Sequence, residues 1–512
     1  MGRKATNLLF VSFIVLDIMI NVTPKPQLST DLPLLILISM DGFRHDYLNQ
    51  TAFKKSDISN FQYFIDQGVR ASHVRNVFPS VTFSNHMTIL TGQYAEEHGV
   101  VHNAFFDPYL NDTFDMHNFY QNFQSKWFDN GAEPIWVTNQ KGGWGRNSGS
   151  VLWPGGIAPV RCIEPRIIPR ATLYNSSDSI SYEKRIDVLI DWFTDKKFNA
   201  INFGMLYFDE PDLSGHKYGP MSREVREEIK RLDSALGYLR KKLNETGLSE
   251  NMNIIITADH GMNQFEDKVV NLDEILDRRW YTTPIHFKHH LVPMIIPHKG
   301  HERHVSVALF GEDGKGKDHK GFFAWWRNGT EMKNRYFSKN RRIMEIILEA
   351  KKGWIIGNNQ TKGPYSKGNH GYNPQNTPDM WPFFIASGPA FQKGLSVPAF
   401  DMVDVYPLMC HVLGLTPAQN RGNLDHVKSL LKNPPVWYKT LETTAVTFIV
   451  VVILAALVGG VFGIAAVRQS SISRRKLMFQ NRRRLDLSPI RSLPETDSML
   501  RSDDDEDDFD GL

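Results

Sequence analysis

The most regular feature of the chain is a set of short apolar runs, each followed by a polar cluster that contains an aspartate. Three such runs occupy residues 34–39, 200–208 and 253–257. Each is short and mostly apolar, which is typical of a strand buried on both faces of a parallel sheet. Shortly after their ends the chain carries Asp41, Asp212 and Asp259. The pattern therefore predicts an α/β fold with a carboxylate beyond each of three buried strands.

A strongly amphipathic helix is predicted between the second and third runs. Its apolar face repeats at intervals of three and four residues, with charged residues between: Val225, Ile229, Leu232, Leu236, Leu239 and Leu243. Gly247 is placed to end this helix. Strand, helix and strand in this order form the crossover unit of a parallel sheet. Because open α/β sheets bind ligands at the carboxyl ends of their strands, the three aspartates are expected to converge there.

Histidines accompany these aspartates and indicate metal binding. His216 follows Asp212 by four residues, His260 follows Asp259 directly, and His370 lies farther along the chain. Buried carboxylates without a partner are costly, so converging carboxylates favour a cation, and mixed aspartate and histidine ligands suit zinc. With three or four ligands per ion, the residues divide into two Zn²⁺ sites. One site would use Asp212, His216 and His370, and the other Asp41, Asp259, His260 and the Thr82 hydroxyl.

Thr82 lies in the segment 79–92, where a proline closes an extended stretch and a helix-forming run begins. A helix N-terminus favours an anion, because its free N–H groups and its dipole carry positive charge. A metal-bound threonine hydroxyl loses its proton more easily, and two ions about 4 Å apart assist an in-line phosphoryl displacement. The alternative is that Thr82 is an ordinary N-cap. Ordinary structural roles are expected for six other histidines: His45, His73, His86, His98, His289 and His290.

The composition is that of a globular protein with one large domain or two ordinary ones. Hydrophobic residues make up 41% of the 512 residues and charged residues 22%, so a large core can be buried. The chain has only 2 cysteines, which excludes a disulfide scaffold, and the sequence does not tell whether Cys162 and Cys410 pair. The net charge of +3 conceals a tail that is first basic and then acidic. This tail, residues 468–512, is predicted to be disordered.

The two ends of the chain predict a single-pass type I membrane protein. Residues 1–24 resemble a secretory signal peptide, with Arg3 and Lys4 before an apolar stretch, although a buried strand or an uncleaved anchor is the alternative. Residues 444–467 are uncharged and long enough to span a bilayer, and basic residues follow them at once. We therefore expect a transmembrane helix at 444–467, a stem at 426–443 and a catalytic domain at 30–425 outside the cell.

Six Asn-x-Ser/Thr triplets precede the apolar segment and none follows it. They begin at Asn49, Asn111, Asn175, Asn244, Asn328 and Asn359. Such triplets are acceptors for N-glycosylation in secreted chains, but a pattern of three residues also arises by chance. They support an extracellular location for the residues before the apolar segment and are predicted glycosylation sites.

Taken together, the motifs resemble the ectonucleotide pyrophosphatase/phosphodiesterase family of the alkaline phosphatase superfamily. The resemblance rests on Met-Asp-Gly-Phe-Arg at 40–44, Thr-Phe-Ser-Asn-His at 82–86, Glu-Pro-Asp at 210–212 with Gly-His at 215–216, Ala-Asp-His-Gly-Met at 258–262 and Asn-His-Gly at 369–371. It covers residues 34 to about 415 and implies an alkaline-phosphatase-like, mostly parallel sheet flanked by helices. It also implies two zinc ions divided as above, with Thr82 as the covalent nucleophile. The chain is similar to the short type I members, the fourth and fifth, between which the sequence does not decide.

The resemblance also implies three substrate-binding residues. Phe83 matches a residue that stacks on the nucleotide base, and Tyr174 matches the residue on the other face of that base. Two aromatic planes can sandwich a purine. Asn103 matches an amide that donates to a phosphate oxygen. The alternative for Phe83 and Tyr174 is ordinary core packing.

The leading hypothesis is an extracellular zinc hydrolase that cleaves nucleotide phosphodiester and pyrophosphate bonds through a phospho-threonine intermediate and releases a nucleoside 5′-monophosphate. Its substrates would be small molecules such as dinucleoside polyphosphates, and no binding of duplex nucleic acid is expected. One alternative is a choline phosphodiesterase acting on lysophospholipid or sphingomyelin, which needs an aromatic pocket for trimethylammonium. The other is a catalytically weak cell-surface interaction protein, against which the intact ligand set argues. The preferred nucleotide and the oligomeric state are left open.

Overall fold

The computed structural model describes residues 32–49, 53–167, 180–195, 200–283, 291–314, 316–359, 361, 365–432, 451–456, 459–460 and 463–476. The chain forms two compact units, Met1–Lys439 and Thr440–Leu512, and the predicted catalytic residues belong to the first. Several predictions lie outside the described residues. These are the signal peptide at 1–24, Tyr174, Asn175, His289, His290, part of the stem and most of the tail.

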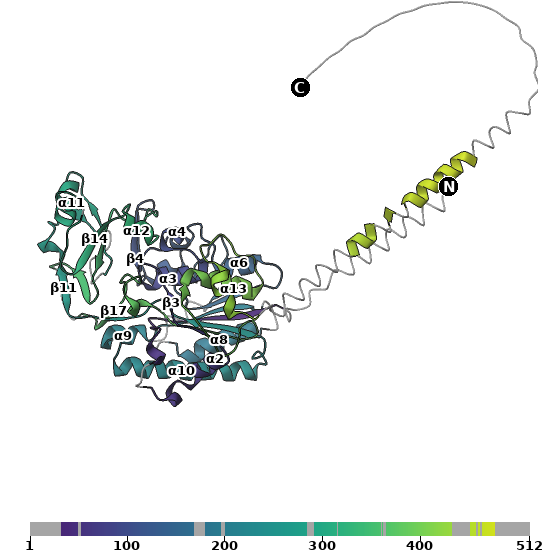
Figure 1. Ribbon diagram of the computed structural model, residues 1–512, viewed down its shortest axis with the longest axis horizontal. Coiled ribbons are helices and arrows are strands. Elements are labelled where there is room, and N and C mark those ends of the chain that lie inside the picture. Colours follow the sequence, from purple (N-terminus) through teal and green to yellow (C-terminus); the bar gives the residue numbers. More distant parts are fainter. Residues whose placement is uncertain are drawn as a thin grey trace, which may run out of the picture. The chain divides into compact units, whose positions relative to one another are not determined.

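An eight-stranded sheet forms the centre of the first unit, in the order β19-β2-β18-β9-β1-β8-β6-β7 (Figure 1). The strands are β19 (Leu395–Val397), β2 (Gly68–Ala71), β18 (Phe384–Ser387), β9 (Met252–Thr257), β1 (Leu34–Met40), β8 (Phe203–Phe208), β6 (Ser148–Val151) and β7 (Arg166–Ile167). The strands β9, β1, β8, β6 and β7 are parallel to one another, whereas β18 is antiparallel to both β9 and β2. The three predicted strands are therefore confirmed, in a sheet that is mixed on the β18 side.

The central strand β1 is buried on both faces, as its continuous apolar sequence predicts. Leu35 and Leu37 pack into one hydrophobic core, and Ile36 and Ile38 pack into the other, all with 0% of their surface exposed. Neighbouring residues alternate because successive side chains of a strand point to opposite faces. Each face of the sheet is consequently covered by its own layer of helices.

The two helical layers lie on opposite sides of the sheet in Figure 1. One layer contains α3 (Thr82–Thr91), α6 (Ile135–Lys141) and α13 (Val405–Leu413). The other contains α2 (Ser59–Asp66), α8 (Tyr182–Phe193) and α10 (Arg223–Glu245). Shorter helices are α4 (Ala95–His98), α5 (Ser125–Phe128), α9 (Asp212–Tyr218), α11 (Glu302–Phe310), α12 (Thr330–Asn334) and α14 (Leu424–Val427). Helix α10 is the amphipathic helix that the sequence predicts, and its whole predicted apolar face is buried.

Polar side chains define where α10 begins and how it meets its neighbour. The Ser222 hydroxyl accepts a hydrogen bond from the Val225 N–H (3.2 Å) and caps the first turn. Farther along, the buried Asp233 carboxylate accepts the backbone N–H groups of Asn60 (2.9 Å) and Phe61 (2.8 Å), at the start of α2. A negative charge at that end stabilises α2 through its dipole. These contacts fix the helical layer that carries the chain from β8 to β9.

A long excursion separates His260 from His370, and the sequence does not predict its structure. It leaves the site through β10 (Asn263–Gln264) and returns through β17 (Gly368–Asn369), and these two strands pair antiparallel, Asn263 opposite Asn369. Between them lie a four-stranded sheet of β12 (Tyr281–Thr282), β13 (Met294–Pro297), β15 (Ile346–Ala350) and β14 (Phe322–Trp326), and the parallel pair β11 (Lys268–Asn271) and β16 (Trp354–Gly357). The β10–β17 ladder therefore returns the chain to the site.

The remaining described strands form two small pairs. Strand β4 (Ala104–Asp107) pairs antiparallel with β5 (Asp112–Asp115), and β3 (Val74–Arg75) pairs parallel with β20 (Phe400–Asp401). Cys162 is exposed and Cys410 is buried, and both are free, so the two cysteines do not pair.

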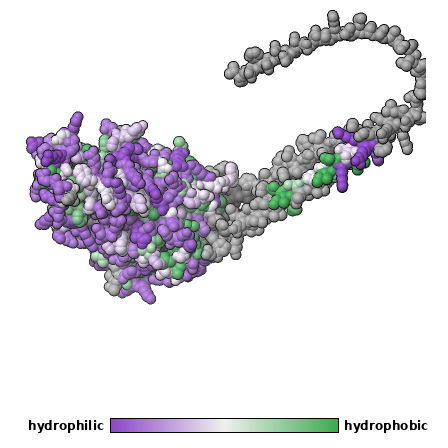
Figure 2. Space-filling model, turned by 45° about the horizontal axis from the view of Figure 1, so that its top comes forward, coloured by the Kyte–Doolittle hydropathy of each residue, from purple (hydrophilic) through white to green (hydrophobic). Residues whose placement is uncertain are grey.

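The second unit contains helical residues at 451–456, 459–460 and 463–476, within and beyond the predicted membrane span of 444–467. Figure 2 shows both hydrophobic and hydrophilic side chains among its described residues. In the sequence the hydrophobic residues come first, and polar and basic residues follow from Arg468. Across the described residues, no helix is both long enough and apolar enough to cross a membrane. Residues 444–450, 457–458 and 461–462 of the predicted span lie outside the described part of the chain.

Candidate active site

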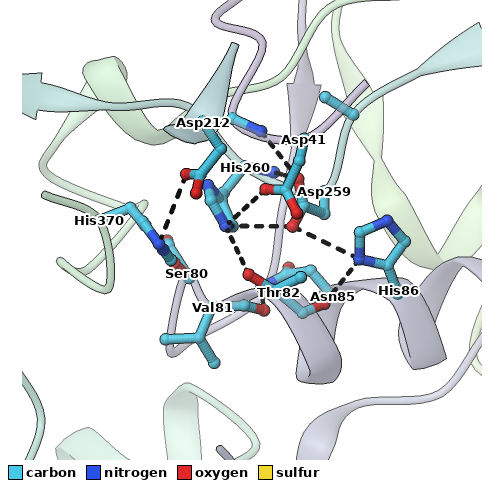
Figure 3. A network of polar contacts seen from close by, with 12 residues as sticks. Asp41, Ser80, Val81, Thr82, Asn85, His86, Asp212, Asp259, His260 and His370 are labelled. Atoms are coloured by element: carbon cyan, nitrogen blue, oxygen red, sulfur yellow. Dashed lines mark hydrogen bonds and ion pairs between the residues drawn. The ribbon is translucent and has the colours of Figure 1, made fainter. Parts of the chain in front are cut away.

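The three predicted aspartates converge at the carboxyl edge of the parallel strands (Figure 3). Asp41 directly follows β1, Asp259 lies just beyond β9, and Asp212 is the first residue of α9, which follows β8. Asp41 is 1% exposed, Asp259 0% and Asp212 8%. One oxygen of each carboxylate is buried without a hydrogen-bond partner in the described structure: Asp41 Oδ1, Asp212 Oδ1 and Asp259 Oδ2. Since buried charges need compensation, this arrangement fits a group that brings positive charge.

Gly42 allows the carboxylates to approach one another. Its backbone has a positive φ of 67°, and a Cβ atom there would lie only 2.9 Å from the Cβ of Asp212. Its N–H donates to Asp259 Oδ1 (3.2 Å), and the N–H of His260 donates to the same oxygen (2.9 Å). Asp41 and Gly42 therefore form a turn after β1 and also belong to the site.

The three predicted histidines share one hydrogen-bonding arrangement. Nδ1 of His216 contacts the Gly368 carbonyl, Nδ1 of His260 contacts the Gly261 carbonyl, and Nδ1 of His370 contacts the Ser80 carbonyl, each at 2.9 Å. A carbonyl only accepts, so each Nδ1 carries hydrogen and each Nε2 is available as a ligand. Metal-binding histidines are commonly oriented by such a bond on the second nitrogen.

The six predicted aspartate and histidine ligands come together through these Nε2 atoms and the carboxylates. His216 Nε2 lies 3.4 Å from Asp212 Oδ2, and His370 Nε2 lies 3.6 Å from Asp212 Oδ1. His260 Nε2 lies 3.0 Å from Asp259 Oδ2 and 3.5 Å from Asp41 Oδ1. The ligand atoms of Asp212, His216 and His370 lie within 4.8 Å of one another, as do those of Asp41, Asp212 and His260. Asp212, His216 and His370 are one of the two predicted ligand sets. Asp212 also lies close to Asp41 and His260, which belong to the other set.

The electrostatics of the cluster favour a cation. Burial raises the pKa of Asp41, and the neighbouring carboxylates of Asp259 and Asp212 raise it further. Burial also raises the pKa of Asp212, against the opposing effect of His216 and His260. At His260, burial acts to lower the pKa, but the charge and hydrogen bond of Asp259, the charge of Asp212 and the Gly261 carbonyl together raise it. Burial, together with His260 and His216, holds the pKa of His370 well below its usual value.

Thr82 lies beside this cluster at the first position of α3. It follows Val81, which is extended, and its Oγ1 lies 3.3 Å from His260 Nε2. The described structure contains no side-chain cap at this helix start, so the alternative of an N-cap threonine is not observed. Thr82 is 4% exposed, and its hydroxyl lies between the helix N-terminus and the predicted ligands.

Asn103 and Phe83 border Thr82. The Asn103 Oδ1 atom accepts the N–H of Phe83 (2.8 Å), so the amide hydrogens of Asn103 are its donors toward a ligand. Phe83 is 5% exposed and packs against Phe114 and Phe128, with ring centroids 5.5 Å and 6.2 Å away. Its predicted stacking on a base stays a prediction, and the second stacking residue, Tyr174, lies outside the described residues.

Two residues of the site were not anticipated as functional. The Tyr207 hydroxyl, on β8, donates to Asp41 Oδ2 (2.5 Å), whereas in the sequence this tyrosine belongs to an apolar run. His86, expected to have an ordinary structural role, places Nδ1 3.4 Å from Asp259 Oδ2. One signal for His86 was its position four residues after Thr82, which puts both side chains on the same side of α3. Tyr207 had no comparable signal.

The predicted glycosylation sites are compatible with the structure. Five of the six asparagines lie in the described residues, and all five are exposed: Asn49, Asn111, Asn244, Asn328 and Asn359. Exposure is required of an acceptor, but it does not show that a glycan is attached. Glycosylation therefore stays a prediction for all six.

Comparisons with known proteins agree with this geometry. A family described as type I phosphodiesterase / nucleotide pyrophosphatase matches residues 35–373. Bis(5′-adenosyl)-triphosphatase of Homo sapiens is 38% identical over 406 residues, covering 78% of this chain and 82% of the relative. Ectonucleotide pyrophosphatase/phosphodiesterase family member 5 of Homo sapiens is 37% identical over 426 residues, covering 83% of both chains.

Two solved structures of murine ectonucleotide pyrophosphatase/phosphodiesterase 5 are also similar. Each superposes with a TM-score of 0.69 at 36% identity and covers 78% of this chain and 100% of the other chain. One of the two is described as an inactive threonine-to-alanine variant in complex with AMP. The similarity supports an alkaline-phosphatase-like α/β fold with a mixed sheet and helices.

Proposed function

Because the chain belongs to the type I phosphodiesterase / nucleotide pyrophosphatase family and is a hydrolase, we propose that it cleaves phosphodiester and pyrophosphate bonds of extracellular nucleotides and releases a nucleoside 5′-monophosphate. The observation that carries the proposal is the cluster around Thr82. Three buried carboxylates with unpartnered oxygens and three histidines with available Nε2 atoms surround one hydroxyl at a helix N-terminus.

The residues present fit two zinc ions. Asp212, His216 and His370 would hold one ion, and Asp41, Asp259, His260 and the Thr82 hydroxyl would hold the other. When bound, such ions supply the positive charge that lowers the pKa of a hydroxyl and offsets the charge of a phosphate. The three buried carboxylate oxygens without a hydrogen-bond partner in the described chain support this assignment.

Thr82 acts as the nucleophile in the proposed reaction. The Thr82 hydroxyl gives its proton to water, its Oγ1 attacks phosphorus, the Thr82–phosphorus bond forms, and the bond from phosphorus to the leaving oxygen breaks as that oxygen takes up a proton from water. Water then attacks the phospho-threonine, the Thr82–phosphorus bond breaks, and Thr82 regains its proton. The first turn of α3 favours negative charge on Oγ1 during both steps. The amide of Asn103 donates to an oxygen of the phosphoryl group.

The similar proteins support the substrate class. One relative is named a bis(5′-adenosyl)-triphosphatase, so dinucleoside polyphosphates are our first candidate substrates. The structure of a relative with AMP fits release of a nucleoside 5′-monophosphate, and the inactivity of its threonine-to-alanine variant fits a threonine nucleophile. Phe83 and Tyr174 are proposed to stack on the two faces of the base.

The proposed location is outside the cell. The exposed sequon asparagines and the names of the relatives as ectoenzymes support it. We propose that residues 1–24 direct secretion and that residues 444–467 anchor the chain, on the strength of their apolar sequences.

A panel of three substrates tests the proposal. Purified full-length protein is incubated with diadenosine triphosphate, a choline phosphodiester and a simple phosphomonoester, and products are separated by chromatography. We expect AMP and ADP from the first substrate and little turnover of the others. Preferential release of phosphocholine would replace the proposal with the choline phosphodiesterase hypothesis. Absence of turnover on all three would favour a cell-surface interaction protein.

A further inference from the structure

His86 differs from the three candidate ligand histidines in how it uses its ring. It lies on α3, four residues after Thr82, and is 0% exposed. His86 Nδ1 contacts the Thr82 carbonyl (2.8 Å), and His86 Nε2 contacts the hydroxyl of Ser39 (2.8 Å). In His216, His260 and His370 only Nδ1 is held by a backbone carbonyl, and Nε2 faces the carboxylates.

These partners define the state of the His86 ring. The Thr82 carbonyl can only accept, so Nδ1 carries the hydrogen, and Nε2 accepts the hydrogen of the Ser39 hydroxyl. Ring atoms of His86 lie within 4.8 Å of oxygens of Asp41 and Asp259, which alone would qualify it as a fourth ligand histidine. Both nitrogens are already engaged, however, so neither offers a free lone pair to a cation.

The contacts of His86 join three segments that each carry a site residue. Ser39 lies on β1, two residues before Asp41, and Thr82 begins α3. Asp259 Oδ2 lies 3.4 Å from His86 Nδ1, a contact that Figure 3 marks with a dashed line. Two further rings fix the plane of the imidazole: Trp153 at 5.0 Å and Tyr207 at 5.4 Å, both edge-on.

We propose that His86 is a positioning residue for the Thr82 nucleophile, an inference that rests on the proposed function. It ties the first turn of α3 to β1 through Ser39 and to Asp259 through Nδ1. Without it, the Thr82 carbonyl and the Ser39 hydroxyl lose their link, and the Thr82 hydroxyl is no longer held in one orientation toward the site. A small displacement of a nucleophile is sufficient to reduce the rate of a reaction that depends on alignment.

The test compares variants on a base-free substrate, a bis(nitrophenyl) phosphodiester. For each variant, kcat, KM, zinc content by mass spectrometry and unfolding midpoint are measured. Loss of a supporting partner of this kind typically costs 10- to 100-fold, so His86→Leu should lower kcat by about that factor with KM and zinc content little changed. His86→Asn should recover most of the loss, because its amide can donate to the Thr82 carbonyl in place of Nδ1. Ser39→Ala, which removes only the second partner, should have the smaller effect.

His98 provides a matched control in the same helix layer. It is also 0% exposed, its Nε2 contacts the Thr88 hydroxyl of α3 (3.2 Å), and its Nδ1 accepts the N–H of Val100 (3.2 Å). His98→Leu removes a buried histidine of α4 that is hydrogen-bonded to α3, without touching Thr82. It should lower the unfolding midpoint and leave kcat of the folded protein near the wild-type value.

Four results would overturn the positioning role. These are an unchanged kcat in His86→Leu, an equal fall of kcat in His98→Leu, loss of zinc in proportion to activity, or failure of His86→Asn to recover kcat. The base-free substrate separates this inference from the proposed function. An inactive wild-type protein on this diester and on nucleotides would overturn both, whereas an active wild type with an equally active His86→Leu would overturn only the inference.

Discussion

Two buried clusters of charged side chains lie in the same domain, and they differ in how completely their charges are paired. The first is the candidate site, where Asp41, Asp212 and Asp259 each keep one oxygen without a hydrogen-bond partner. The second is centred on Asp107 and Arg342, both 0% exposed. We call these the site cluster and the Asp107–Arg342 cluster.

The Asp107–Arg342 cluster is fully paired by protein groups. Asp107 accepts hydrogen bonds from the guanidinium groups of Arg341 (2.8 and 2.7 Å) and Arg342 (2.7 Å), and from the N–H of Tyr109 (2.9 Å). Arg342 also donates to the carbonyls of Gly99 (2.7 Å), Trp127 (2.8 Å) and Lys126 (2.9 Å). Burial would raise the pKa of Asp107, but these two arginines hold it far below its usual value.

The comparison separates a structural role from a functional one. The Asp107–Arg342 cluster is complete within the protein, so its loss should cost stability and leave the chemistry intact. The site cluster is incomplete within the described chain, and it would be completed by ions and substrate. Its loss should therefore cost activity, and parts of it should be removable with little loss of stability. The predictions below test this difference, from the largest expected effect to the smallest.

Thr82→Ala should abolish activity and leave the fold intact. Removing a catalytic nucleophile costs at least about 10³-fold in kcat. Thr82→Ser, which keeps a hydroxyl, should retain measurable turnover, and both variants should unfold at the wild-type midpoint. Hydrolysis of diadenosine triphosphate measures the rate. A near-normal rate for Thr82→Ala would mean that Thr82 is not the nucleophile.

Arg342→Leu should destabilise the protein and spare the chemistry. Removing one partner of a buried charge pair leaves the other uncompensated and costs about 3–5 kcal/mol. Urea unfolding measures the loss, and kcat per folded molecule should stay near the wild-type value. If stability stayed the same while kcat fell, the Asp107–Arg342 cluster would not be the structural one.

His98, which lies near Arg342, should make the protein less stable in mild acid. Burial lowers the pKa of His98 to about 3, and the charge of Arg342 also lowers it. Because the unfolded chain binds a proton at a pKa of about 6.5 and the folded chain does not, stability falls as the pH drops from about 6.5 toward 3.

Replacing His98 with leucine should remove that part of the pH dependence. For a single histidine, the difference in unfolding free energy between pH 7 and pH 5 should shrink by about 2 kcal/mol. Parallel urea titrations of wild type and His98→Leu at the two pH values provide the measurement. The same pH dependence in both proteins would show that His98 does not remain neutral.

Asp41→Asn should change stability by a small amount, in the opposite direction to Arg342→Leu. In metal-free protein this substitution removes one of three neighbouring negative charges. The amide oxygen still accepts the Tyr207 hydroxyl, as Asp41 Oδ2 does. The amide nitrogen takes the place of the unpartnered Oδ1 and can donate to the remaining carboxylates. Chelated Asp41→Asn should therefore be more stable than chelated wild type by about 1 kcal/mol. Its activity with zinc should be much lower. Destabilisation of the chelated variant would contradict the comparison.

Much of the site cluster could be predicted because several of its residues lie just after predicted strands. Asp41 and Asp259 follow continuous apolar strands, and the amphipathic pattern of α10 links two of those strands in parallel. The position of His370 next to His260 could not be predicted from such patterns. It depends on the pairing of Asn263 with Asn369 across the long excursion, and pairing between distant segments leaves no periodic signal in one sequence.

The Asp107–Arg342 cluster and the roles of His86 and Tyr207 were also not predicted from sequence, for a physical reason. Asp107 and Arg342 are separated by 235 positions and belong to no recognisable motif. Tyr207 faces Asp41 because its strand pairs with β1 in one register, Ser39 opposite Tyr207. Contacts of this kind follow from tertiary packing, whereas strands, amphipathic helices and residues at strand ends follow from local pattern.

Coupled recovery of activity and stability on zinc addition tests the central claim most directly. Full-length protein is stripped with a chelator and titrated with zinc, while diester hydrolysis, bound zinc and the unfolding midpoint are followed in the same samples. We predict that the stripped protein is inactive and that activity and midpoint rise together, saturating at two zinc ions per chain. Full activity in protein from which all bound metal has been removed would contradict the account.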